Sequence, residues 1–123
     1  MSEVEPELWV GDAPRAVAFY QDAFGAVVIH QAGDGADIVA RLDVDGARFW
    51  VAPSNPSIGR NHPAQMAGAT ARLLLAVDDP EEAFNRAIAA GARELSPVQT
   101  EHGWTIGRVV DPFGHEWEIA RPD

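Results

Sequence analysis

The chain has 123 residues, no cysteine, and 9 basic against 19 acidic side chains, which gives a net charge of −10. This length suits one domain with its own hydrophobic core, and the missing cysteines exclude disulfides and thiolate metal sites. The negative charge argues against a nucleic-acid partner, and the acidic start and short apolar runs predict neither a signal peptide nor a membrane segment, so we expect a cytoplasmic protein.

The first half of the chain predicts four strands and one helix. A strand is expected at residues 5–10, and Asp12 caps a helix whose apolar stripe stops at Gly25. Further strands are predicted at residues 27–31, 37–43 and 48–51, separated by Gly-containing turns typical of hairpins. The expected order is therefore β-α-β-β-β.

The second half predicts the same order after a long loop over residues 52–68. A strand at residues 70–77 leads to a helix capped by Asp78 and ended by Gly91. A short strand at about residues 93–96, a turn-rich patch, a strand at 104–110 and a closing strand from Glu116 to Ala120 follow. The turn before the closing strand is Asp-Pro-Phe-Gly, at residues 111–114.

The two halves are copies of one unit. Asp12 and Gly25 match Asp78 and Gly91 at the same offset, since 78 − 12 = 66 and 91 − 25 = 66. We therefore predict a single α+β domain over residues 1–123, with module 1 at about 4–52, a loop at about 53–68 and module 2 at about 69–121. Each module covers one face of its half-sheet with a helix, and the opposite faces can curl around a shared space, with the helices on the convex side.

Strand alternation predicts which side chains point away from the helices. Trp117 is assigned to the helix-facing core, whereas Trp104 begins a strand beside the opposite face. That opposite face pairs aromatic rings with charges, and its expected members are Glu7, Trp9, Arg48, Trp50, Arg72, Leu74, Glu116 and Glu118. Arg48 and Arg72 are the expected counter-ions of the carboxylates there.

Two segments carry a family resemblance: VGDAP at residues 10–14 with the following Phe19-Tyr20, and RVVDPFGHEW at residues 108–117. They resemble the glyoxalase/bleomycin-resistance/dioxygenase (vicinal oxygen chelate) superfamily, in particular its small single-domain glyoxalase-like members. The resemblance covers residues 5–121. It implies paired βαβββ modules, a cleft on a curled mixed sheet and a homodimer.

The resemblance also implies places for metal ligands, on the first and last strand of each module. In this sequence they fall at Glu5, Trp50, Arg72 and Glu118. Trp50 cannot ligate a metal and Arg72 is a permanent cation, so we expect no cofactor. If a divalent metal such as Zn, Fe, Ni or Mn is bound, Glu5 and Glu118 are its candidate ligands.

None of the four histidines has the close pairing of a local metal motif. We predict a turn or packing role for His115 and solvated positions for His62 and His102. Either of the last two could also act as a proton carrier over the cleft.

The leading functional hypothesis is a metal-free protein that binds a small aromatic or cationic molecule, as in drug or metabolite sequestration. The predicted ligand-binding residues are Glu7, Trp9, Arg48, Trp50, Arg72, Trp104, Glu116 and Glu118. One alternative is an enzyme: a divalent-metal lyase or dioxygenase, or a metal-free isomerase with Glu118 as catalytic base. Another is a partner-binding module whose cleft is filled by its own side chains.

Overall fold

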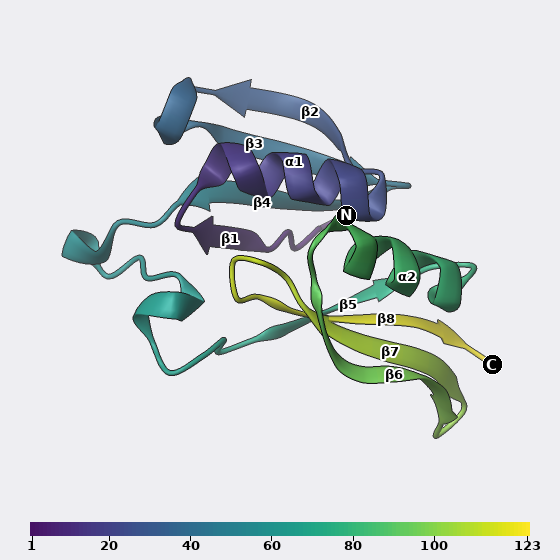
Figure 1. Ribbon diagram of the computed structural model, residues 1–123. Coiled ribbons are helices and arrows are strands. Elements are labelled where there is room, and N and C mark those ends of the chain that lie inside the picture. The colour runs from purple at the N-terminus through teal and green to yellow at the C-terminus, as the bar shows by residue number, and fades with distance from the viewer.

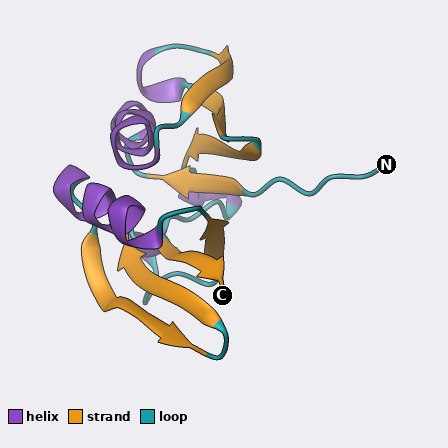
Figure 2. Ribbon diagram, turned by 90° about the vertical axis from the view of Figure 1, so that its right-hand side faces the viewer, coloured by secondary structure: helices purple, strands orange, loops and turns teal.

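The computed structural model describes residues 1–123 as two four-stranded mixed sheets with both helices on the same side (Figures 1 and 2). Module 1 consists of β1 (Glu7–Val10), α1 (Ala13–Phe24), β2 (Val27–Ala32), β3 (Val39–Val44) and β4 (Ala47–Pro53). Module 2 consists of β5 (Arg72–Ala76), α2 (Pro80–Ala90), β6 (Arg93–Glu101), β7 (Trp104–Val110) and β8 (Glu116–Pro122). The repeated β-α-β-β-β order and the α+β class are confirmed.

Both sheets have the same topology. The strand orders are β1-β4-β3-β2 and β5-β8-β7-β6. In each sheet the module's first and last strands pair in parallel, and the remaining pairs are antiparallel. Neither helix is long and apolar enough to cross a bilayer.

The start of the second helix differs from the prediction. The residue that caps α2 is Asp79, whose side chain accepts a hydrogen bond from the Glu82 amide at 3.1 Å, and not Asp78. Pro80 is the first helical residue, and a proline forces the residue before it into an extended conformation. The cap must therefore be the residue next to the proline, whereas in α1 the proline stands one position further in.

Strand β6 is longer than predicted. It continues from Arg93 to Glu101, through the patch expected to be turns. Its pairing with β7 shifts register on both sides of Ser96, and it contains Pro97, which cannot donate a ladder hydrogen bond. Because β6 is an edge strand, it tolerates both the bulges and the proline.

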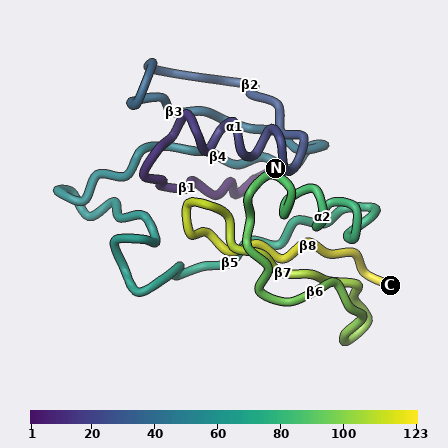
Figure 3. The backbone as a smooth tube through the Cα atoms, viewed as in Figure 1, coloured from purple at the N-terminus to yellow at the C-terminus, as the bar shows by residue number.

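The long connection between β4 and β5, whose path Figure 3 shows, contains two short 3-10 turns, Pro56–Ile58 and Pro63–Gln65, and an isolated bridge between Asn55 and Arg60. The second of these turns lies against the Asp-Pro-Phe-Gly turn: a methyl group added at Gly114 would lie 2.7 Å from Pro63 Cβ. The loop therefore packs on the turn that leads into β8.

The two modules share one core. Tyr20 of α1 is fully buried, and its ring contacts Phe24 and Phe49 of its own module and Trp117 of β8. Trp117 is 2% exposed, which confirms its assignment to the helix-facing side. The helices α1 and α2 also pack against each other, so the two sheets are held in a fixed relation.

The buried carboxylate Asp111 joins the modules. It is 3% exposed and accepts hydrogen bonds from the Tyr20 hydroxyl, from Trp117 Nε1 at 3.0 Å, and from the backbone amides of Phe113 and His115 at 2.9 and 3.0 Å. Burial and the neighbouring carboxylate raise the pKa of Tyr20 well above its usual value. The hydroxyl therefore stays protonated and donates a hydrogen bond to Asp111. This network fixes the turn that feeds β8.

Candidate functional site

The faces of the two sheets that point away from the helices carry ordered rows of polar and aromatic side chains. We call them the helix-averted faces. We number the sheets of modules 1 and 2 as sheet 1 and sheet 2. In sheet 1 one row crosses all four strands in register, from Glu7 to Trp50, Arg41 and His30. The equivalent row in sheet 2 contains Leu74, Glu118, Arg108 and Ser96. Arg41 and Arg108 therefore occupy equivalent places.

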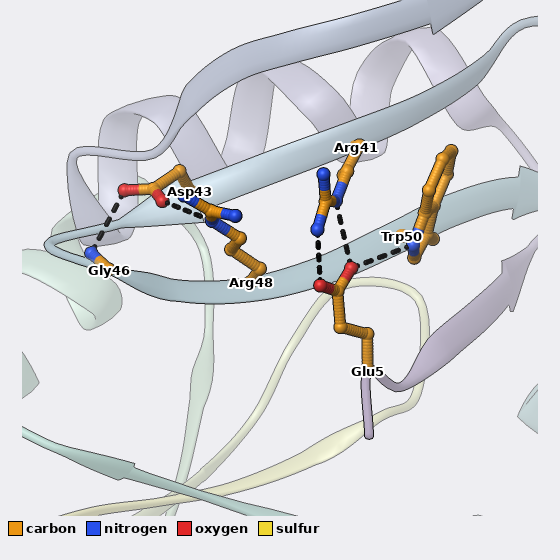
Figure 4. Close-up of polar contacts among 6 residues, drawn as sticks. All are labelled: Glu5, Arg41, Asp43, Gly46, Arg48 and Trp50. Carbon is orange, nitrogen blue, oxygen red and sulfur yellow. Dashed lines mark hydrogen bonds and ion pairs between the residues drawn. The ribbon is translucent and has the colours of Figure 1, made fainter. Parts of the chain in front are cut away.

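In module 1 the centre of this face is a contact between Arg41, Trp50 and Glu5 (Figure 4). Arg41 binds the Glu5 carboxylate through two nitrogens, with Nε 2.9 Å from Oε1 and Nη2 on Oε2. Trp50 Nε1 donates to the same Oε1 at 3.0 Å. Hydrogen bonds from Arg41 lower the pKa of the Glu5 carboxyl against the opposing effect of burial.

The Trp50 ring has two further neighbours. The Arg41 guanidinium carbon lies 5.7 Å from its ring centre, within cation–π range, and the His30 ring meets it edge to face at 5.9 Å. The predicted aromatic position thus lies in a small group of cationic and aromatic side chains.

Arg48 does not reach the carboxylates for which it was predicted as a counter-ion. Its Nε binds Asp43 at 3.0 Å across the β3–β4 hairpin, and the Gly46 amide donates to the same carboxylate at 3.0 Å (Figure 4). The Gly46 amide, and then Arg48, lower the pKa of Asp43. The short hairpin places these groups side by side, so Arg48 forms its ion pair within its own hairpin.

In module 2 the face carries a chain of ion pairs. Glu118 Oε2 lies 2.8 Å from Arg108 Nε and 3.3 Å from Arg72 Nη2, and Arg108 Nη2 lies 2.7 Å from Glu101. Arg72 is therefore a counter-ion of Glu118, as expected. A carboxylate held by two guanidinium groups differs from the desolvated carboxylate among indoles that the general-base hypothesis requires.

The remaining predicted site residues are dispersed. Glu7 and Trp9 border a cavity of about 380 Å³ under the β4–β5 loop, where Trp9 Nε1 is buried without a hydrogen-bond partner. Glu116 borders another cavity, of about 650 Å³, at the Asp-Pro-Phe-Gly turn. Trp104 lies at the outer end of β7, opposite Glu101 and Pro122. The eight residues predicted to bind a ligand do not surround one cavity.

The histidines lie in separate places. His115 Nε2 contacts the Trp9 carbonyl oxygen at 2.8 Å and so links the β8 turn to β1. His62 Nδ1 contacts Ser54 Oγ at 2.9 Å within the long loop. The first contact agrees with the packing role predicted for His115.

The donor set does not fit a metal ion. No group of three or more His, Cys, Asp or Glu side chains converges to hold one. Of the two candidate ligands, Glu5 is bound by Arg41 and Glu118 by Arg108 and Arg72. A guanidinium at each carboxylate repels a cation, and it occupies both oxygens of Glu5 and Oε2 of Glu118.

Sequence reasoning missed Arg41 and Arg108, which organise the two faces. Both lie on middle strands, at alternating positions that point away from the helices. The alternation rule applied to those strands, as well as to the first and last strand of each module, would have identified them.

Known proteins match the chain over nearly its whole length. The model of the Glyoxalase/Bleomycin resistance protein/Dioxygenase superfamily matches residues 4–119. The uncharacterized protein Rv0887c of Mycobacterium tuberculosis is 33% identical over 125 residues, covering 97% of this chain and 74% of that protein. The crystal structure of TioX from Micromonospora sp. ML1 is similar with a TM-score of 0.77, 29% identity and full coverage of both chains.

A more distant structure shares the fold. A mutant of the fosfomycin resistance protein FosX from Listeria monocytogenes, solved with Mn(II) and 1S,2S-dihydroxypropylphosphonic acid, is 17% identical. Its TM-score is 0.75, and the match covers 100% of this chain and 92% of that one.

Proposed function

The chain belongs to the glyoxalase/bleomycin resistance protein/dioxygenase superfamily, and on this basis we propose that it binds and sequesters a small organic molecule without a metal ion. The observation that carries the proposal is Trp50. The family resemblance implies that this indole falls at a metal-ligand position of the family's metalloenzymes, and it lies on the helix-averted face of sheet 1 beside Arg41 and His30. Such a group can bind an aromatic body and a polar substituent together.

The ion pairs of sheet 2 support binding over catalysis. Glu118 is the candidate base, and Arg108 and Arg72 both bind it. An isomerase would need this carboxylate free to accept a proton from its substrate. Paired charges of this kind can instead position a ligand's polar groups without taking part in a reaction.

A thermal-shift screen against aromatic metabolites, amines and antibiotics tests the proposal. We expect at least one compound that raises the Tm of the wild type and leaves the Tm of Trp50→Ala unchanged. Trp104→Ala removes the same side chain from the outer end of sheet 2 and should keep the response. A broad library without any hit would refute small-molecule binding.

Elemental analysis of protein purified without a histidine tag tests the metal-free part separately. We expect well below one equivalent of Zn, Fe, Ni or Mn per chain. A stoichiometric metal would instead support the lyase or dioxygenase alternative.

We further propose that the protein is a homodimer located in the cytoplasm. Val27 and Leu74 are apolar residues on strands of the two sheets, and they are 59% and 48% exposed. A second copy would remove this apolar surface from water. Light scattering should show a dimer that Leu74→Glu dissociates, whereas Ile58→Glu, at a more exposed loop residue, should leave it intact.

A further inference from the structure

Equivalent arginines in the two modules bind carboxylates from different parts of the chain. In sheet 2, Arg108 pairs in register with Glu118 on the neighbouring strand, and the two side chains form an ion pair. In sheet 1, Arg41 pairs in register with Trp50. The strand beside Arg41 therefore offers an indole in the position where the strand beside Arg108 offers a carboxylate.

The carboxylate that Arg41 binds comes from outside the sheet. Glu5 precedes β1, in a leading segment (residues 1–6) that forms no strand and extends away from the body in Figure 2. The four residues before Glu5 are exposed, and Glu5 alone of these five is half-buried. The Glu5 side chain binds the Arg41–Trp50 pair, and the neighbouring Pro6 carbonyl oxygen accepts a hydrogen bond from the Trp50 amide at 2.8 Å, whereas residues 1–4 are exposed.

We propose that Arg41, Trp50 and His30 form a binding site for a small aromatic monocarboxylate, and that Glu5 occupies this site in the free protein. The inference rests on the proposed small-molecule binding and names its ligand class. The ligand's carboxylate takes the place of the Glu5 carboxylate, accepting from Arg41 Nε and Nη2 and from Trp50 Nε1. Its ring lies against the indole and imidazole.

Charge explains why the ligand class is a monoanion. The chain carries a net charge of −10, so an acid needs a local cation to approach, and Arg41 supplies it. Arg48, on the same sheet, is neutralised by Asp43. Glu7 stands in register beside Trp50 and would repel a second negative charge. The expected order of affinity is therefore benzoate first, acetate second, and phthalate or the cation benzylamine last.

The experiment follows the indole Nε1–H resonances in ¹H–¹⁵N spectra while benzoate is added. The chain has four tryptophans, and Trp50→Phe identifies the signal of interest. Because the Glu5 carboxylate competes with benzoate for the same site, Glu5→Ala should bind benzoate about tenfold more tightly than the wild type. The resonance that moves on addition of benzoate should be that of the Trp50 indole. Glu3→Ala removes the same charge from the same segment and should bind like the wild type.

Arg41 provides the decisive comparison. Arg41→Gln in the Glu5→Ala background should abolish benzoate binding, and Arg41→Lys, which keeps the charge but not the two-pronged geometry, should weaken it. Unchanged resonances of the other three indoles report that each variant is folded. Benzoate binding that is equal in wild type and Glu5→Ala, or independent of Arg41, would overturn the site.

The same variants separate this inference from the proposed function. A library compound whose binding is lost in Trp50→Ala but unchanged in the Glu5 and Arg41 variants supports small-molecule binding and refutes the carboxylate site. Arg41-dependent benzoate binding to Glu5→Ala, with no library hit on the wild type, supports the site and refutes sequestration by the native protein.

Discussion

Tyr20→Phe tests whether the buried network at Asp111 holds the modules together. The substitution keeps a ring that contacts Phe24, Phe49 and Trp117 and removes only the hydroxyl that donates to Asp111. A hydrogen bond to a charged group contributes about 1.5–3 kcal/mol, so we expect a loss of about 2 kcal/mol in the free energy of unfolding. The cost has one origin, because the packing volume hardly changes.

The loss can be converted to a melting temperature. An unfolding entropy of about 2.1 cal/mol/K per residue over the 123 residues gives about 0.26 kcal/mol/K. A loss of about 2 kcal/mol then lowers Tm by about 8 °C. Thr105→Val is the matched control, because it removes a hydroxyl that donates to the exposed Asp123 at 2.6 Å. That control should change Tm by no more than about 2 °C, since water replaces the exposed partner.

Chemical denaturation of a double-mutant cycle checks the cause. Asp111→Asn removes the charge and turns an amide donor toward the donors of Tyr20 and Trp117, and should cost more than Tyr20→Phe. In the Asp111→Asn background, Tyr20→Phe should cost less than half of what it costs alone. Strictly additive losses, or a Tyr20→Phe variant as stable as the wild type, would refute the network as a source of stability.

The same hydroxyl predicts a pH dependence. The pKa of Tyr20 in the folded protein is raised well above its ordinary value of 10.0, so the folded state keeps a proton that the unfolded state loses. The contribution is complete below about pH 10 and is lost as the pH rises above it. Between about pH 8 and about pH 11, Tm should therefore fall more in the wild type than in Tyr20→Phe.

Three further predictions concern single contacts. Gly107→Ala should cost about 1–3 kcal/mol in urea denaturation, because its methyl group would lie 2.7 Å from Phe84 and 2.8 Å from Val98, and Val98→Ala should restore part of the loss. Asp79→Ala should cost about 1 kcal/mol by removing the cap of α2, whereas Asp78→Ala should be nearly neutral, and the reverse order would refute the assigned cap. Because Arg41 lowers the pKa of Glu5, the Glu5 contact persists above the ordinary carboxyl pKa of 4.5 and is lost on acidification below it. The Trp50 indole resonance should move in that range, and an identical movement in Glu5→Gln would contradict this assignment.

The secondary structure was largely predictable because its signals are local. Caps, turn glycines and alternation lie within a few residues of the elements that they specify, and they identified both helices and the repeated strand order. Strand β6 was the exception, because a proline and two bulges conceal it in the sequence. Its extension depends on pairing with β7, which no signal within β6 itself reveals.

The polar contacts were less predictable, because they depend on register between distant segments. The contact between Glu118 and Arg72 agrees with alternation, which placed both side chains on the same face. Glu5 and Arg41 are 36 positions apart, and Glu5 lies outside any strand, so periodicity could not bring them together. Asp111 was read only as a turn residue, since nothing in a turn motif indicates that a tyrosine about ninety positions earlier donates to it.

The unequal surroundings of Arg41 and Arg108 have a consequence for stoichiometry. A duplicated module would ordinarily offer two copies of any site that it carries. Here Glu118 occupies the second copy from the neighbouring strand of its own sheet, whereas Glu5, which the proposed ligand displaces, occupies the first from the segment before β1. Each chain should therefore take up one aromatic acid and not two, and a homodimer should take up two at symmetry-related places.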